Sequence, residues 1–282
     1  MGICIGLKFK MLLGNDVPSG EVTEKSAGGF SGKDEFGKSF FLSCDQLNSK
    51  ADPTKRNLKL FHERNKKMIH PKLIKFYTHT LDLIPITELN FKAFTLSTPQ
   101  PKILRCVLSY LPQLSKLNLC ETRLGNSGLY QISRSFEYIN NLTHLSIEQN
   151  FVNEVGFVKF SKNLRYLTKL EVISIGNNQI GIQGMASFTQ AIEQFTYLKE
   201  IYVHNNEVDF DMLQILVNTC KCIKSLKLVN LEFNKLERSS ISILNTLCIS
   251  GSIRQLYLRC NLYEDEDIEL LLNILPAIEI NI

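Results

Sequence analysis

The side chains best suited to chemistry in this sequence are five histidines and eight cysteines. The histidines do not form a His-Glu-x-x-His metal motif, and no Gly-x-Ser-x-Gly nucleophile motif occurs. Cys220 and Cys222 form a close pair, but a zinc site needs a second pair of ligands at similar spacing. The sequence therefore predicts a protein that is not an enzyme and that holds no metal ion and no cofactor.

The segment from Gly32 to Ser39 matches the spacing of a phosphate-binding P-loop. In a functional P-loop, a buried strand delivers the loop and a helix follows it. Here residues 24–31 are polar and rich in glycine, and Asp34 and Glu35 would place negative charge beside the phosphate. We therefore interpret the match as a coincidence of composition.

The first four residues are similar to an acylated N-terminus, in which Gly2 would carry myristate and Cys4 would carry palmitate. Gly6 occupies the position at which such motifs prefer Ser or Thr. Alternatively, the alternating apolar residues of 3–9 favour a strand. A membrane is expected as a partner only if Gly2 and Cys4 are acylated.

The composition favours an intracellular globular protein. The chain is 44% apolar, and no run of eighteen apolar residues could span a membrane. Lys8 and Lys10 interrupt the first apolar stretch, so no secretory signal is expected. The net charge of +4 is too small to require a nucleic-acid partner. We expect a cytoplasmic location with reduced thiols.

An apolar pattern that repeats every 28 residues indicates the elements that position the remaining side chains. Its core positions are Ile86, Leu89 and Phe91, then Leu114, Leu117 and Leu119, then Leu142, Leu145 and Ile147, then Leu170, Ile173 and Ile175, and then Leu198, Ile201 and Val203. Two units of altered length are predicted next, starting at Ile223, 25 residues after Leu198, and at Ile253. Seven units therefore share one motif.

Each unit combines signals for a short strand and a helix. The alternation of Leu117 and Leu119 suits a strand, whereas Met185, Phe188 and Ile192 have helical spacing. A recurring asparagine, as at Asn150, can bond backbone groups where the chain leaves the strand. One unit cannot bury its own apolar face, but stacked units form a continuous core.

The pattern resembles the leucine-rich-repeat family, in its longer ribonuclease-inhibitor-like class. The resemblance implies an α/β solenoid, or horseshoe, with a concave parallel β-sheet and convex helices. It divides the chain into an N-terminal extension (1–57), a divergent capping unit (58–85) and about seven repeats (86–282). The expected departures include Thr122 and Leu231 at the asparagine position.

Repeat arrays bind partners through the variable residues of the concave sheet. One predicted outward column is Asn90, Asn118, Ser146, Ser174, Tyr202, Lys227 and Tyr257, and the next is Lys92, Cys120, Glu148, Gly176, His204, Val229 and Arg259. Tyrosine and arginine are frequent binding anchors. We therefore predict that Tyr202, His204, Lys227, Tyr257 and Arg259 contact a protein partner.

The most consistent function is a non-enzymatic scaffold or adaptor that binds protein partners, within a larger assembly. The alternative is a regulator of a small GTPase, because Ran GTPase-activating proteins use repeats of this class. Those proteins typically carry an acidic C-terminal tail, whereas this chain has only the acidic run 264–267.

Overall fold

A computed structural model describes residues 5–8, 24–25, 28–33, 39–44, 86–96, 100–109, 111–249, 252–276 and 278–282. The predicted capping unit, residues 58–85, and the candidate acylation sites Gly2 and Cys4 lie outside these residues. Within 86–282, strands and helices alternate along the chain, and strand follows strand in one sheet.

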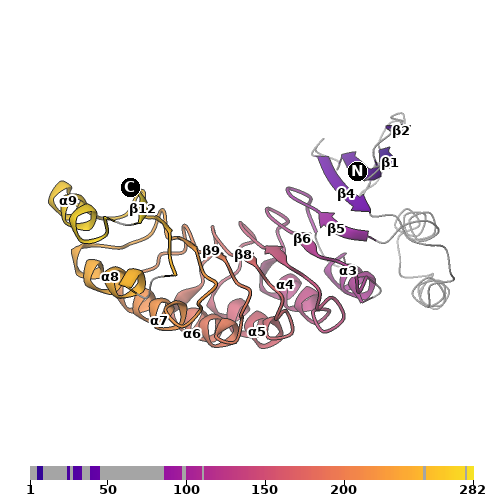
Figure 1. The fold of residues 1–282 in the computed structure, drawn as a ribbon. Helices are drawn as coiled ribbons and strands as arrows, with labels where there is room; N and C mark the ends of the chain where they lie inside the picture. The colour runs from indigo at the N-terminus through magenta and orange to yellow at the C-terminus, as the bar shows by residue number, and fades with distance from the viewer. Residues whose placement is uncertain are drawn as a thin grey trace.

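Eight consecutive parallel strands form the inner side of an arc (Figure 1). They are β5 (Ile86–Asn90), β6 (Lys116–Asn118), β7 (His144–Ser146), β8 (Val172–Ser174), β9 (Glu200–Tyr202), β10 (Leu228–Asn230), β11 (Gln255–Tyr257) and β12 (Glu279–Asn281). Leu117 pairs with Leu145, which pairs with Ile173, so neighbouring strands are offset by one repeat. Equivalent positions of successive repeats therefore form one row across the sheet.

The helices cover the outer, convex side of the arc (Figure 1). They are α3 (Gln100–Leu108), α4 (Gly125–Ser133), α5 (Glu154–Leu164), α6 (Gly181–Ile192), α7 (Phe210–Cys220), α8 (Ile241–Ile249) and α9 (Asp265–Ile274), with a 3₁₀ turn η1 (Arg238–Ser240) before α8. Asn153 caps α5 by accepting hydrogen bonds from the amides of Val155 and Gly156. Asp209 caps α7 in a similar way.

The core lies between the sheet and the helices. The central strand residues Leu145, Ile173 and Ile201 are almost completely buried. From the helical side, Phe160 packs edge to face against Phe136 and Phe157, with ring centroids 5.9 and 6.1 Å apart. This alternation of parallel strands and helices confirms the predicted α/β solenoid with a concave sheet and convex helices.

A ladder of buried asparagines follows the strands. Its members are Asn150, Asn178, Asn206 and Asn234, together with the less buried Asn261. The amide of Asn178 donates to three backbone carbonyls, at 3.0 to 3.1 Å. Its Oδ1 accepts from the backbone amides of Asn150 and Val152 in the preceding repeat. The ladder thus provides hydrogen-bond partners for the backbone amides and carbonyls of the turns that face the core, where water cannot reach.

Thr122 replaces asparagine in the second repeat, as expected from the sequence. Its hydroxyl oxygen lies 2.8 Å from both Leu119 O and Asn150 Oδ1, and its single hydrogen can donate to either acceptor. The contact with Asn150 connects Thr122 to the ladder of the next repeat. One hydroxyl makes fewer bonds than an amide, and Asn150 supplies a further bond to Leu119 O.

The sixth repeat differs in register from the sequence prediction. The prediction took Ile223, Leu226 and Leu228 as its core positions, 25 residues after those of the fifth repeat. The sheet instead pairs Val229 with Ile201, which lies 28 residues earlier. The sixth repeat therefore begins at the regular offset of 28 residues, and the prediction is wrong by three residues. The seventh repeat follows after 27 residues, because Val229 pairs with Leu256.

The correct register moves several side chains. Val229, predicted to face outward, is fully buried in the core, and Lys227 precedes β10 rather than lying in the column of Tyr202. Asn230 takes the place predicted for Lys227. Asn234, not Leu231, is at the asparagine position of this repeat, and its amide donates to Leu231 O. The expected departure at Leu231 is therefore also wrong.

Four further strands continue the sheet beyond β5. They are β1 (Ile5–Lys8), β2 (Glu24–Lys25), β3 (Gly28–Lys33) and β4 (Ser39–Cys44), and β4 pairs antiparallel with β5. The P-loop-like segment runs from the end of β3 to the start of β4. Ser39 thus begins a strand where a P-loop would begin a helix, which favours coincidence for this motif.

Candidate functional site

Outward-facing side chains stand in straight rows across the concave sheet because the repeats are in register. The row at the end of each strand contains Asn118, Ser146, Ser174, Tyr202, Asn230 and Tyr257. The row two residues further along contains Cys120, Glu148, Gly176, His204, Glu232 and Arg259. The largest side chains in these rows come from β9 and β11 and from the residues after them.

Tyr202 is held in place by its own strand. Its hydroxyl donates a 2.8 Å hydrogen bond to the carboxylate of Glu200, and its side chain is partly buried. Burial and, next, the bond to the Glu200 carboxylate raise the pKa of Tyr202 well above its usual value. Tyr202 therefore keeps its proton throughout the physiological pH range, and Glu200 holds its hydroxyl in place.

Tyr202 and Tyr257 stand on either side of Asn230 in one row. The Asn230 amide donates to Glu232 Oε2 at 3.0 Å, and its Oδ1 accepts from the Glu232 amide. Two strand spacings separate the tyrosines, which is about 9–10 Å. Asn230 is only 8% exposed, and both tyrosines beside it are more exposed.

His204 is packed against Gly176 of the neighbouring repeat. A Cβ atom on Gly176 would lie 2.2 Å from His204 Cε1, so only glycine leaves room for the ring. His204 Nε2 lies 2.9 Å from the amide nitrogen of Asn177, and Asn177 Oδ1 accepts from Asn205. With these amide orientations, Nε2 accepts a hydrogen bond and Nδ1 carries the proton. Nδ1 is buried and has no hydrogen-bond partner among the described residues.

The polar groups next to His204 do not form a serine–histidine pair. Glu148 Oε2 lies 3.9 Å from His204 Nε2, and Glu148 accepts a hydrogen bond from the hydroxyl of Ser174. A catalytic serine would need its hydroxyl on the imidazole, whereas this hydroxyl bonds to the carboxylate. The thiol of Cys120 is 2.7 Å from the hydroxyl of Ser146, and burial raises its pKa, which disfavours the reactive thiolate.

Four of the five predicted contact residues gather at one end of the concave sheet. Tyr202 and His204 belong to the fifth repeat, and Tyr257 and Arg259 to the seventh. Lys227 is separated from them: it is exposed beside β10, and its Nζ donates to Ser252 O at 3.3 Å. Its predicted place in the binding column is therefore corrected.

The sequence prediction missed Glu200, Asn230 and Glu232 at this end of the sheet. Glu200 was missed because the projected columns omitted the first residue of each strand. Asn230 and Glu232 were missed because the sixth repeat was placed in the wrong register. Asn234 was the available signal, since it lies 28 residues after Asn206.

In the described part of the chain, no three potential metal ligands lie close enough together to hold a metal ion. No helix among those residues is long and apolar enough to cross a membrane. The acylation of Gly2 and Cys4 stays a prediction.

Comparison with known proteins gives distant structural similarities. No family model and no curated protein matches the chain. Among solved structures, actin-binding site 2 of leiomodin-1 is 15% identical over 45% of this chain and 78% of its own, with a TM-score of 0.39. A leucine-rich-repeat protein of Leptospira interrogans is 20% identical over 62% of this chain and 45% of its own, with a TM-score of 0.41.

The 28-residue register and the asparagine ladder decide the fold. The chain has a leucine-rich-repeat fold. Its leucine-rich repeats position the candidate surface in a simple way, because each repeat contributes one short strand and therefore only a few outward side chains.

Proposed function

We propose that this leucine-rich-repeat protein is a non-enzymatic interaction scaffold or adaptor that binds a protein partner on its concave sheet. The observation that carries the proposal is the row formed by Tyr202, Asn230 and Tyr257 on β9 to β11. Large rings at both sides of a small residue provide contact area together with hydrogen-bonding groups, which is typical of binding hot spots.

The surroundings of this row favour a partner that brings a basic side chain. Glu148, Glu200 and Glu232 lie close to the tyrosines, and Arg259 is the nearby cation in the same rows. A cation above Asn230 would be about 5 Å from each flanking strand, within the range of a cation–π interaction with both rings. The charge and the aromatic rings therefore favour a lysine or arginine of the partner.

The rigid arrangement of the site favours binding as well. Tyr202 is fixed by Glu200, Asn230 by Glu232, and His204 by Asn177 and Gly176. Side chains that are ordered before binding lose less conformational entropy when the partner arrives.

Quantitative affinity purification with the full-length protein tests the proposal. Tyr202 and Tyr257 are changed to Ala together, and the matched control changes Tyr138 and Tyr197, which are exposed outside the concave rows. We expect a partner that the control retains and the concave variant loses. For that purified partner, Kd should rise about 30-fold or more, which corresponds to roughly 2 kcal/mol. Equal recovery with both variants would contradict the proposal.

The small-GTPase regulator remains the alternative prediction. It requires faster GTP hydrolysis when the protein is added to GTP-loaded small GTPases, whereas passive binding leaves the rate unchanged.

A cytoplasmic location within a larger assembly is likewise proposed, and fluorescence microscopy of a C-terminal fusion would test the location.

A further inference from the structure

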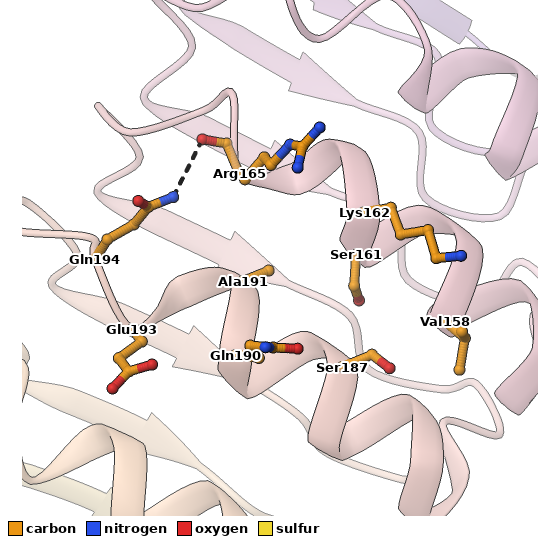
Figure 2. Close-up of a pocket in the computed structure, with 9 residues that line it drawn as sticks. All are labelled: Val158, Ser161, Lys162, Arg165, Ser187, Gln190, Ala191, Glu193 and Gln194. Atoms are coloured by element: carbon orange, nitrogen blue, oxygen red, sulfur yellow. Dashed lines mark hydrogen bonds between the residues drawn. The ribbon is translucent and has the colours of Figure 1, made fainter.

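A polar groove lies between α5 and α6 on the convex side, away from the concave rows (Figure 2). Its volume is about 680 Å³, within the usual range for ligand sites. Ser161 of α5 extends toward α6, where Ser187 and Gln190 lie, and the small side chain of Ala191 leaves space between the helices (Figure 2). The groove is thus bordered by hydrogen-bonding side chains.

The preceding repeat shows what this groove lacks. In that repeat, Asn163 of α5 donates a 3.0 Å hydrogen bond from its amide to the hydroxyl of Ser133 on α4. Twenty-eight residues later, Ser161 corresponds to Ser133, but Ala191 replaces Asn163. The amide side chain that bridges α4 and α5 therefore has no counterpart between α5 and α6.

The hydroxyl of Ser161 is left without the partner that Ser133 has. Ser161 is 3% exposed, and its Oγ makes no hydrogen bond within the described part of the chain. A buried hydroxyl without a partner costs free energy, so a ligand that donates a hydrogen bond there recovers that cost. The N–H donor that Asn163 supplies to Ser133 indicates the kind of group required.

The charges around the groove add a second requirement. Lys162 and Arg165 border it from α5, and neither forms an ion pair with a described residue. The guanidinium of Arg165 lies over the ring of Tyr166, 5.2 Å from its centroid, and donates to the Tyr166 hydroxyl at 3.4 Å. It points away from Ser161, as does the carboxylate of Glu193 (Figure 2). Lys162 is therefore the cation that follows Ser161 on α5, and its charge favours an anionic group beside the N–H donor.

We propose that the α5–α6 groove binds an acidic peptide segment, with a peptide N–H donating to Ser161 Oγ and a carboxylate beside Lys162. Ser187 and Gln190 provide further hydrogen bonds to such a segment. The site is independent of the concave surface, so one protein would hold two polypeptides on opposite sides of its arc.

The variant Ala191→Asn tests the proposal directly, because it restores the amide that the preceding repeat carries. We expect Asn at this position to bond to Ser161, to preserve the fold and to block the groove. Thr196→Asn, an exposed change outside the groove, is the matched control. Ser161→Ala is a second variant that keeps the shape of the groove and removes only the hydroxyl.

The probe is the blocked peptide acetyl-Ala-Asp-Ala-amide, titrated into the isotopically labelled full-length protein and followed by backbone NMR signals. We expect shifts at residues 161, 187 and 190, with an affinity at least tenfold weaker in Ala191→Asn and severalfold weaker in Ser161→Ala. Thr196→Asn should bind like the unchanged protein.

Two controls distinguish other occupants. Acetyl-Ala-Lys-Ala-amide should cause no shifts at these residues, and inorganic phosphate should bind more weakly than the acidic peptide. The proposal is overturned if the acidic peptide leaves these residues unshifted, if it binds Ala191→Asn equally well, or if the lysine peptide or phosphate binds as tightly.

Discussion

Gly176 and His204 fit together on the concave surface as a pair of residues from adjacent repeats. In Gly176→Ala, the new methyl group would overlap the imidazole, and we expect the ring to leave Asn177 while the backbone stays folded. NMR of the histidine side chains, with His204 assigned through His204→Gln, measures this movement. Gly128→Ala, a helical change with looser contacts, should leave the His204 signals unchanged.

Cysteine reactivity is a second test at the residue scale. Burial raises the pKa of Cys220 and of Cys248 to about 12, so at pH 8 only about one thiol in ten thousand is ionised. We expect iodoacetamide to label the exposed Cys222 and Cys260 before Cys220 and Cys248. Raising the pH from 8 to 9 should increase the thiolate of the buried pair about tenfold. Mass spectrometry of the labelled peptides gives the order, and early labelling of Cys220 would be inconsistent with its burial.

The single side chains of the site could be predicted only in part. The alternation within a strand placed Tyr202, His204 and Tyr257 outward, because a strand exposes every second residue. The hydrogen bonds of Tyr202 with Glu200 and of His204 with Asn177 depend on rotamers, which repeat spacing does not specify.

At the scale of elements, each ladder asparagine connects one strand-to-helix turn to the next. The amide of Asn206 donates to Ile175 O, Val203 O and His204 O. Asn206→Ala leaves several buried backbone groups without partners, so we expect a loss of about 3 kcal/mol or more in the free energy of unfolding. Urea denaturation measures this loss. Gln214→Ala, on the exposed side of α7, should change it by less than about 0.5 kcal/mol.

The error in the sixth repeat shows why apolar spacing alone does not define an element. The predicted core positions are Ile223, Leu226 and Leu228, and the true positions are Leu226, Val229 and Leu231. The two sets have the same spacing. All five positions contain an apolar residue, so burial preference cannot separate the two frames. The need for a polar side chain in the turn does separate the two frames, because only the second frame places Asn234 where the turn needs an amide.

The groove between α5 and α6 was not predictable from the repeat motif. The motif concerns residues that face the core, whereas Ser161 and Ala191 meet between helices on the convex side. The sequence does contain the contrast between Asn163 and Ala191, but its meaning depends on the Asn163–Ser133 hydrogen bond.

At the scale of the whole molecule, stability should depend on contacts between neighbouring repeats. Leu145 is 1% exposed in the middle of the sheet, so Leu145→Ala should cost about 2–5 kcal/mol through lost burial and a cavity. Because repeats stabilise one another, amide hydrogen exchange should also accelerate in β6 and β8. Lys162→Ala, an exposed change, should alter stability by less than about 0.5 kcal/mol. Equal melting temperatures for the two variants would contradict this register.

The constant offset between strands also has a genetic consequence. From Leu89 to Val229, the central residue of each strand recurs every 28 residues. Unequal recombination that duplicates residues 145–172 would add one strand, one helix and one ladder asparagine without shifting any core residue. The arc would lengthen by about 4.8 Å at the sheet. The span of the concave face can therefore evolve in whole-repeat steps while its folding rules stay the same.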